Sequence, residues 1–277
     1  MPSPGHPSPS SSVSASRIFS GAEAAAPERA ELAQLAEEWP FTIVFNGVPF
    51  AVLMCTPADL EDLAVGFAVT ERVVASAGDI TRLDIVRHAA GIEAQCEVSA
   101  ELAAAAVNRG RRLPSRTGCG ICGATSASEI LPPLPRARPG VTIDAACVSH
   151  AMRELATMQP LNDATGATHA AAWAGLDGRI TLVREDVGRH NALDKLVGAR
   201  LRSAASDAGF VVLTSRGSYV LVQKAAMLGA PLLATVSAPT ALAVRVAEEC
   251  GMTLAGFVRD ERMTLYTNPG RVTRAPG

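Results

Sequence analysis

Two cysteines stand three residues apart in a glycine-rich stretch, a spacing that suits thiol chemistry. Cys119 and Cys122 lie in the segment Gly118-Cys119-Gly120-Ile121-Cys122-Gly123. Cationic side chains lower the pKa of a nearby thiol, and the thiolate is its reactive form. Four arginines precede the pair: Arg109, Arg111, Arg112 and Arg116. The pattern indicates a nucleophilic thiol that accepts sulfur as a persulfide, with a second thiol placed for exchange.

Three other interpretations of the cysteine pair stay open. A zinc knuckle needs two more ligands at close spacing, and the sequence has no second pair, so we expect no metal. A thioredoxin-type disulfide stands at a helix N-terminus directly after a strand, whereas this pair follows an Arg/Gly stretch. Two structural cysteines are the plainest alternative, but buried thiols are not usually placed among three glycines.

The cysteines lie in a segment, residues 108–140, that has no helical or strand period. It is rich in arginine and contains five prolines: Pro114, Pro132, Pro133, Pro135 and Pro139. A long structureless segment in a compact protein is usually functional or disordered. We therefore predict a basic, cysteine-containing loop over 108–140.

Composition excludes several classes of protein. The formal net charge of -2 and the isoelectric point of about 6.2 argue against a general nucleic-acid binder. The remaining four cysteines are widely spaced, which predicts reduced thiols and a cytoplasmic protein.

The uncharged stretch 225–244 is interrupted by Pro231 and Pro239, so we interpret it as a buried strand between helices and not a membrane span. Residues 1–26 are Ser/Pro-rich and predict a disordered tail with no signal peptide.

Residues 27–107 predict a small α+β region. Phe41–Phe45 and Val48–Met54 flank Asn46-Gly47, which is typical of a hairpin whose second strand, carrying Pro49, lies at a sheet edge. Thr56 has the position of a helix N-cap ahead of an amphipathic pattern from Leu60. Two further strands are expected at Ile80–His88 and Ile92–Val98, and 102–107 could be a helix or a strand.

Residues 141–277 alternate between helical and strand patterns. Helices are expected at Ile143–Met158, Val187–Ala204, Tyr219–Leu228 and Leu242–Cys250, and strands at Ile180–Val183, Phe210–Thr214, Leu232–Val236, Leu254–Val258 and Met263–Tyr266. This alternation predicts a mostly parallel sheet with helices on both faces. Ligands of such folds bind at the carboxyl ends of strands, here 185–191, 214–218 and 237–240, all polar and bearing glycine or serine.

The motifs together resemble one family, the formate dehydrogenase accessory sulfurtransferases of the FdhD type. The resemblance covers most of the chain after residue 26, and several independent motifs occur in order. They are Cys55–Phe67, Arg116–Gly123, Glu185–Lys195, Ser237–Thr240 and Leu254–Phe257. The resemblance implies a cytidine-deaminase-like layered α/β core, which agrees with the alternating pattern.

The resemblance also implies a function. A cysteine desulfurase would load Cys119 with persulfide sulfur, with Cys122 as its partner, for delivery to the Mo-bis(molybdopterin guanine dinucleotide) cofactor of formate dehydrogenase. The cofactor-binding stretch of the family matches Phe257, Val258, Arg259, Asp260, Glu261 and Arg262. Arginines of this stretch suit pyrophosphate, and Asp260 suits a guanine edge. A homodimer is implied as well, with no nucleic acid or membrane among the partners.

The sequence departs from the family pattern at two turns. Where the family has Ser-Gly-Arg-x-Ser followed by Tyr-Glu, this chain has Thr214–Val220, with Ser215 and Val220 as the differences. A second family glycine is replaced by Ala167. The lost glycines would stiffen two turns near the predicted crevice, and Val220 removes a charge. The cysteine segment is unaffected.

A zinc deaminase is excluded by its own signature. Such enzymes need His-x-Glu together with Pro-Cys-x-x-Cys. His169 is followed by two alanines and His190 by Asn191-Ala192, so the general acid/base glutamate is missing. Two interpretations of His190, Asp194 and Arg189 stay equally open. Each could have a function, or His190 and Asp194 would cap and brace their helix and Arg189 would face solvent.

Two functions are left. The preferred one is a sulfurtransferase acting through a Cys119 persulfide. The alternative is a non-catalytic chaperone that binds the molybdenum cofactor and uses the cysteines for redox sensing or for structure. They differ in one expectation: only the first needs Cys119 for activation of formate dehydrogenase.

Overall fold

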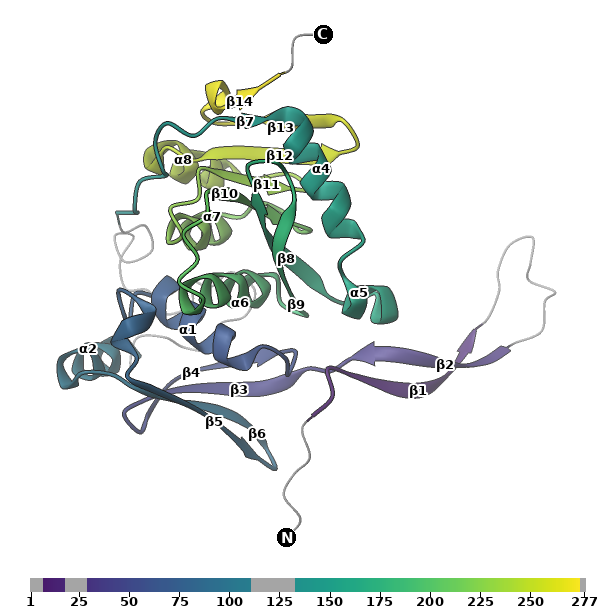
Figure 1. Cartoon of the computed structure of the whole chain (residues 1–277). Helices are drawn as coiled ribbons and strands as arrows, with labels where there is room; N and C mark the ends of the chain where they lie inside the picture. The colour runs from purple at the N-terminus through teal and green to yellow at the C-terminus, as the bar shows by residue number, and fades with distance from the viewer. Residues whose placement is uncertain (1–6, 18–28, 111–132, 275–277) are drawn as a thin grey trace.

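The computed structural model describes residues 7–17, 29–110 and 133–274. It is a mixed α/β structure, as expected. Its larger sheet has six strands, a smaller one has four, and β-pairing near the N-terminus forms a two-stranded ribbon. Figure 1 shows helices flanking the larger sheet, the smaller sheet beside it, and the ribbon projecting from the N-terminal part of the chain. None of the helices in these ranges is both long and apolar enough to cross a membrane.

The larger sheet contains two hairpins and two parallel pairs. Its strands are β8 (His169–Gly175), β9 (Ile180–Asp186), β10 (Gly209–Leu213), β11 (Leu232–Thr235), β12 (Thr253–Arg259) and β13 (Arg262–Leu265). In the order β13-β12-β11-β10-β8-β9, only β10–β11 and β11–β12 are parallel. The prediction of a mostly parallel sheet is therefore wrong. The tight turns after β8 and β12 force antiparallel neighbours, and β8 was not predicted from the sequence.

Helices cover both faces of this sheet, as predicted. On one side lie α6 (Arg189–Arg202), α7 (Tyr219–Ala226) and α8 (Ala241–Cys250), and on the other lies α4 (Ala145–Ala156). Successive strand residues alternate between the two faces. Trp173 and Val211 face α6–α8, whereas Ala172 and Val212 face α4.

The smaller sheet has the order β4-β3-β6-β5. Its strands are β3 (Trp39–Phe45), β4 (Val48–Cys55), β5 (Arg82–His88) and β6 (Gly91–Glu97). The hairpin and the edge position of Pro49 are confirmed. The helix α1 (Leu60–Thr70) packs on this sheet, where Phe67 meets Phe50 edge to face. Residues 102–107 belong to a helix, α2 (Ala100–Gly110), which extends into the first residues of the predicted loop.

Two glycines let the helices α1 and α6 touch backbone to backbone. A Cβ on Gly66 would lie 1.7 Å from the carbonyl oxygen of Asp194, and one on Gly198 would lie 1.8 Å from that of Asp62. No side chain fits at either position. This crossing joins the smaller sheet and its helix to the larger one.

Two local expectations are corrected. Residues 10–17, which we expected to belong to a disordered tail, form β1 (Ser10–Arg17), paired with β2 (Arg29–Ala36). Five of the eight residues of β1 are serine, so only the pairing reveals the strand. Thr56 is not the N-cap of α1: that position is held by Asp59 in a left-handed conformation, because Thr56 is buried in contacts with the larger sheet.

Short elements complete the chain. They are η2 (Ala77–Asp79), β7 (Ile143–Asp144), α5 (Pro160–Thr165), η3 (Pro269–Arg271) and β14 (Val272–Thr273). The cysteines 55, 96 and 250 are buried free thiols, and Cys147 is partly exposed. Burial raises the pKa of the Cys96 thiol to about 12, which agrees with a packing role.

Candidate functional site

The predicted crevice segments do come together at one end of the strands of the larger sheet. We call this end, where the carboxyl ends of most strands lie, the carboxyl edge. The strands β9, β10, β11 and β12 run in the same direction, so their carboxyl ends share this edge. Gly217, after β10, pairs with Pro239, after β11. The amide of Phe257 in turn donates to the carbonyl of Ser237 over 3.4 Å. The loops after β10 and β11 are thus continuous with the end of β12.

Three cationic or titratable side chains lie at this carboxyl edge. His169 begins β8, Arg189 follows β9, and Arg216 follows β10. Burial lowers the pKa of Arg189, and the charge of the neighbouring Arg216 lowers it further. Arg189 and Arg216 are therefore near enough to repel each other. Repulsion of this kind is relieved by an anion.

The stretch matched to the cofactor site forms the β12–β13 hairpin at the same edge. Phe257 is 45% exposed and has a positive φ of 52° at a break in the β12–β13 register. Such a conformation is an outlier for a bulky residue and marks strain that functional sites often hold. Val258 is fully buried, so its side chain is not available to a ligand.

The hairpin carries two arginines, with two acids between them in the sequence. Arg259 and Arg262 are register partners across β12 and β13, and both are exposed. The Nε of Arg259 donates to the carbonyl of Val236 over 3.4 Å. Arg153 of α4 donates to the backbone carbonyl of Asp260 at 3.2 Å, which leaves the Asp260 carboxylate out of this contact. The hairpin thus brings two exposed arginines and two exposed acids to the carboxyl edge.

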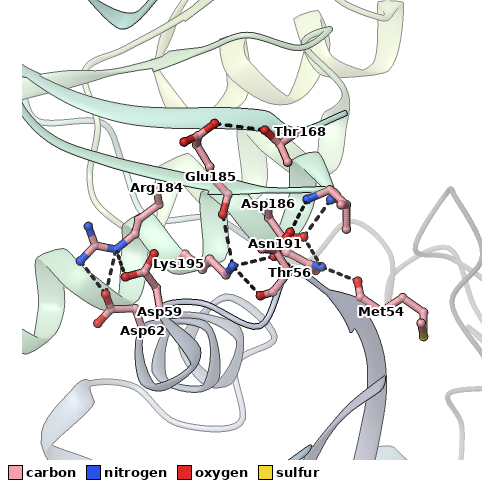
Figure 2. A network of polar contacts seen from close by, with 12 residues as sticks. Met54, Thr56, Asp59, Asp62, Thr168, Arg184, Glu185, Asp186, Asn191 and Lys195 are labelled. Carbon is pink, nitrogen blue, oxygen red and sulfur yellow. Dashed lines mark hydrogen bonds and ion pairs between the residues drawn. The ribbon is translucent and has the colours of Figure 1, made fainter. Parts of the chain in front are cut away.

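A buried ion pair fixes the turn that carries Arg189. The Nζ of Lys195 lies 2.7 Å from Oδ2 of Asp186, and both side chains are fully buried. Asp186 also accepts hydrogen bonds from the amides of Thr56 and Gly188 and from the side chain of Asn191. Figure 2 shows these groups converging from β4, β9 and α6. Every charged atom of the pair has partners, as a buried ion pair requires.

The same network ties the two sheets together on both sides of the ion pair. Lys195 donates to the carbonyls of Thr56 and Glu185, and Asn191 donates to that of Met54. The carboxylate of Glu185 caps α5 by accepting from two of its amides. The motif 185–195 therefore serves first to hold the loop after β9 in place.

A second group of charges braces the contact between α1 and α6. Asp62 accepts two hydrogen bonds from Arg184 (Figure 2). It also pairs with Arg202. Asp194 and Lys224 form a buried ion pair at 2.8 Å, and Thr70 donates to the same carboxylate. The structural interpretation of Asp194 is confirmed. The only two lysines of the chain are thus both used in buried pairs.

The cysteine pair, Cys119 and Cys122, lies outside the described residues. The described residues that follow it are anchored at the amino ends of β11 and β12, which is the opposite end of these strands from the hairpin. The amide of Ala137 donates to the carbonyl of Cys250, before β12, and that of Arg138 to the carbonyl of Gly229, before β11. Arg72 also donates to the carbonyl of Pro133 at 2.9 Å. The described flank of the cysteine segment and the 257–262 hairpin are therefore at different ends of the strands.

Within the ranges that the structure describes, no group of three or more His, Cys, Asp or Glu side chains is placed to hold a metal ion. Residues 36–273 match the sequence profile of the family described as FdhD/NarQ. The chain belongs to the FdhD/NarQ family.

Relatives within the FdhD/NarQ family cover nearly the whole chain. A protein named Sulfur carrier protein FdhD from Bordetella petrii is 46% identical over 244 residues, which are 88% of each chain. Another of the same name, from Xanthomonas euvesicatoria pv. vesicatoria, is 48% identical over 240 residues, 86% of this chain and 85% of its own.

A solved structure has the same fold. It is described as a formate dehydrogenase accessory protein from Desulfotalea psychrophila, and it aligns with a TM-score of 0.75 at 24% identity. The alignment covers 95% of this chain and 99% of that one. The fold of this chain, with its two sheets, is therefore shared with that protein.

Reasoning from the sequence missed the role of the buried lysines. Lys195 ended a family motif, and Lys224 was assigned none. One signal was present in the sequence: only two of the 25 basic residues are lysine, which sets these two positions apart. Of the two interpretations left open for Arg189, a side chain that simply faces solvent does not agree with its buried Nε.

The site predicts an unusual histidine. Burial lowers the pKa of His169 below its ordinary value of 6.5, Arg189 lowers it further, and Asp186 opposes both. In an NMR titration we expect one histidine pKa below 6.5 that moves back up in Arg189→Gln. The unfolded chain binds this proton more tightly, so His169 makes the fold less stable as the pH falls through 6.5. A His169 signal that titrates identically in both proteins would contradict this account of the edge.

Proposed function

We propose that this protein is a sulfur carrier that accepts sulfane sulfur on Cys119 and delivers it to the molybdenum cofactor of a formate dehydrogenase. The names of relatives 46–48% identical over most of the chain support sulfur carriage. The observation of the structure that supports an anionic acceptor is the carboxyl edge. Arg189 and Arg216 lie at this edge, and so does the hairpin that carries Arg259 and Arg262.

The proposed chemistry starts with an attack of the Cys119 thiolate on the outer sulfur of a desulfurase persulfide. The donor's S–S bond breaks, a new S–S bond forms on Cys119, and the donor cysteine leaves as a thiolate. Release as sulfide needs two electrons. Cys122 can supply them by attacking Cys119, which expels hydrosulfide and leaves a Cys119–Cys122 disulfide. An external thiol then reduces that disulfide.

The family resemblance supplies the finer parts of this proposal. They are a cysteine desulfurase as donor, the Mo-bis(molybdopterin guanine dinucleotide) cofactor as acceptor substrate, residues 257–262 as part of its binding site, a homodimer, a cytoplasmic location and a cytidine-deaminase-like core. The side chains of Phe257, Arg259, Asp260, Glu261 and Arg262 are available for this role, and Val258 offers only its backbone.

A sulfur-loading experiment tests the proposal. The full chain is incubated with a cysteine desulfurase and cysteine, and its intact mass is measured with and without a reductant. We expect a reducible gain of one sulfur atom in the wild type and in Cys147→Ala, but not in Cys119→Ala. Cys147 is a matched control because it is the partly exposed thiol among the four described cysteines.

Two results of this experiment would overturn sulfur carriage: no adduct on the wild type, or an undiminished adduct on the Cys119→Ala/Cys122→Ala double variant. Complementation of a strain that lacks the accessory protein separates the chaperone alternative. A chaperone would let Cys119→Ala activate formate dehydrogenase, whereas a sulfur carrier would not. The edge cations make the chaperone worth testing, because they can bind the cofactor without any thiol.

A further inference from the structure

The side chain of Asn46 takes the place of a backbone peptide at the end of the smaller sheet. The parallel pairing of β3 with β6 ends at Phe45 and Cys96, and the amide of Asn46 still donates to the carbonyl of Cys96 at 3.0 Å. Beyond that point the backbone turns back into β4. The side-chain amide of Asn46 then continues the ladder: Nδ2 donates to the carbonyl of Val98 at 2.9 Å, and Oδ1 accepts from the amide of Val98 at 2.8 Å. We call these two hydrogen bonds the amide bridge.

The amide bridge holds the start of α2 against the smaller sheet. Val98 is buried, and α2 begins two residues later at Ala100. The residue between them, Ser99, accepts at its Oγ from the amide of Leu102 at 3.3 Å, as a helix N-cap does. Loss of the amide bridge would therefore free the first turn of the helix from the end of β6.

The residue that makes the amide bridge also stands in the sequence context that most favours spontaneous deamidation. Asn46 is followed by Gly47, in the one Asn-Gly pair of the sequence, and both residues are exposed. Glycine has no side chain to hinder its amide nitrogen, so this nitrogen can attack the side-chain carbonyl carbon of a preceding asparagine. A Cβ added to Gly47 would meet nothing within 4 Å, so water can reach the turn. The local sequence and the exposure of the turn therefore both favour the reaction.

The fold opposes this reaction in two ways. Asn46 and Gly47 have positive φ values of 47° and 80°, as a type I′ turn requires. To close a ring onto the nitrogen of Gly47, Asn46 has to rotate out of this turn conformation, and its side chain has to leave Val98. The labile amide is therefore protected while the amide bridge is intact, and the reaction has to wait for a local opening of this corner of the sheet.

We propose that Asn46-Gly47 is a deamidation site that the amide bridge protects and that reacts when the bridge opens. The nitrogen of Gly47 attacks Cγ of Asn46, the Cγ–Nδ2 bond breaks, and ammonia leaves with the proton that the nitrogen of Gly47 loses. Water then opens the cyclic imide to aspartate or isoaspartate, with no oxidant or reductant. Either product lacks the Nδ2 donor, so the bond to the carbonyl of Val98 cannot re-form. The site is independent of the proposed sulfur carriage, because its chemistry uses only this dipeptide and water.

Peptide mapping of the full chain by mass spectrometry, after incubation at mildly alkaline pH, tests this proposal. We expect Asn46 to deamidate at least about tenfold more slowly in the native protein than in the protein unfolded by guanidinium chloride, because two hydrogen bonds have to break first. Ser99→Ala removes the N-cap of α2 without changing the labile dipeptide, and it should speed up the native reaction severalfold. Ser203→Ala is the matched control: the hydroxyl of Ser203 donates to the carbonyl of Arg200 at the end of α6, so its removal should leave the rate unchanged.

The product of the reaction gives a second measurement. Asn46→Asp reproduces the aspartate product, and we expect the amides of residues 98–103 to exchange hydrogen about tenfold faster in this variant than in the wild type. Asn162→Asp makes the same chemical change in α5 and should leave these amides unchanged. Three outcomes would overturn the proposal: equal deamidation in the native and the unfolded protein, a Ser99→Ala rate no faster than that of Ser203→Ala, or unchanged exchange in Asn46→Asp.

Discussion

Replacing Lys195 with methionine should lower the free energy of unfolding by about 3–5 kcal/mol, which is the usual cost of removing one partner from a buried ion pair. The side chains of Lys195 and Asp186 are both fully buried, and the two charges are 2.7 Å apart. Methionine fills most of the same volume but leaves the Asp186 carboxylate without its cation. A domain of this size has roughly 5–15 kcal/mol to lose, so the variant should be near the threshold of folding.

The double variant Asp186→Asn/Lys195→Met serves as the control for this prediction. Asparagine is neutral and keeps an oxygen for the amides that Asp186 serves, so the double variant should regain part of the loss. Urea unfolding followed by fluorescence measures all three proteins. A Lys195→Met protein within 1 kcal/mol of the wild type would show that the pair is not the clamp between the two sheets that its geometry indicates.

Gly66→Ala should be almost as damaging, because the added methyl group has no space. Its Cβ would lie 1.7 Å from the carbonyl oxygen of Asp194, and that oxygen belongs to the backbone of α6. The helices α1 and α6 would have to separate, at a cost of about 3 kcal/mol, the upper end of the usual range for overpacking, partly offset by about 1 kcal/mol from the better helix propensity of alanine. Thermal unfolding of the variant measures the loss.

Two further variants sharpen this prediction. Gly78→Ala is the matched control, since its Cβ would meet only the Ser76 hydroxyl at 3.7 Å. Gly66→Ala/Gly198→Ala should lose less than the sum of the single losses, because helices already separated by one methyl group accommodate the second. Strict additivity, or a stable Gly66→Ala protein, would mean that the helices do not meet as closely as described.

Local patterns in the sequence predicted most elements but not how the strands pair. The hairpin around Asn46-Gly47 and the helix from Leu60 follow from turn chemistry and periodicity, which are local. The strand β8 is an alanine run, His169–Gly175, buried on both faces, so it has no alternation to recognise. Missing it led to the wrong prediction of a mostly parallel sheet. The prediction that Thr56 is a helix N-cap was wrong for a related reason: its hydrogen-bond partners, Asp186 and Val187, are about 130 residues away in the sequence.

The candidate site, too, could be predicted only in part from the sequence. The strand ends 185–191, 214–218 and 237–240 were predicted as one crevice, because strand ends that point the same way must meet at one edge. Which of their side chains are free was beyond sequence reasoning. Arg184 and Arg189 are five residues apart, yet the first is paired with Asp62 and the Nε of the second is buried without a hydrogen-bond partner in the described part of the chain. Only the packing of α1 against α6 decides between them.

The burial of both lysines has a practical consequence for labelling. Lys195 is 0% exposed and Lys224 is 4% exposed, so the folded chain presents no lysine amine to a reagent. Amine-reactive dyes, biotin esters and lysine cross-linkers should therefore modify the native protein only at its N-terminus. Any further adduct in a mass spectrum would come from molecules in which a buried lysine has become exposed. Acylation kinetics would then report how often the contact between the two sheets comes apart.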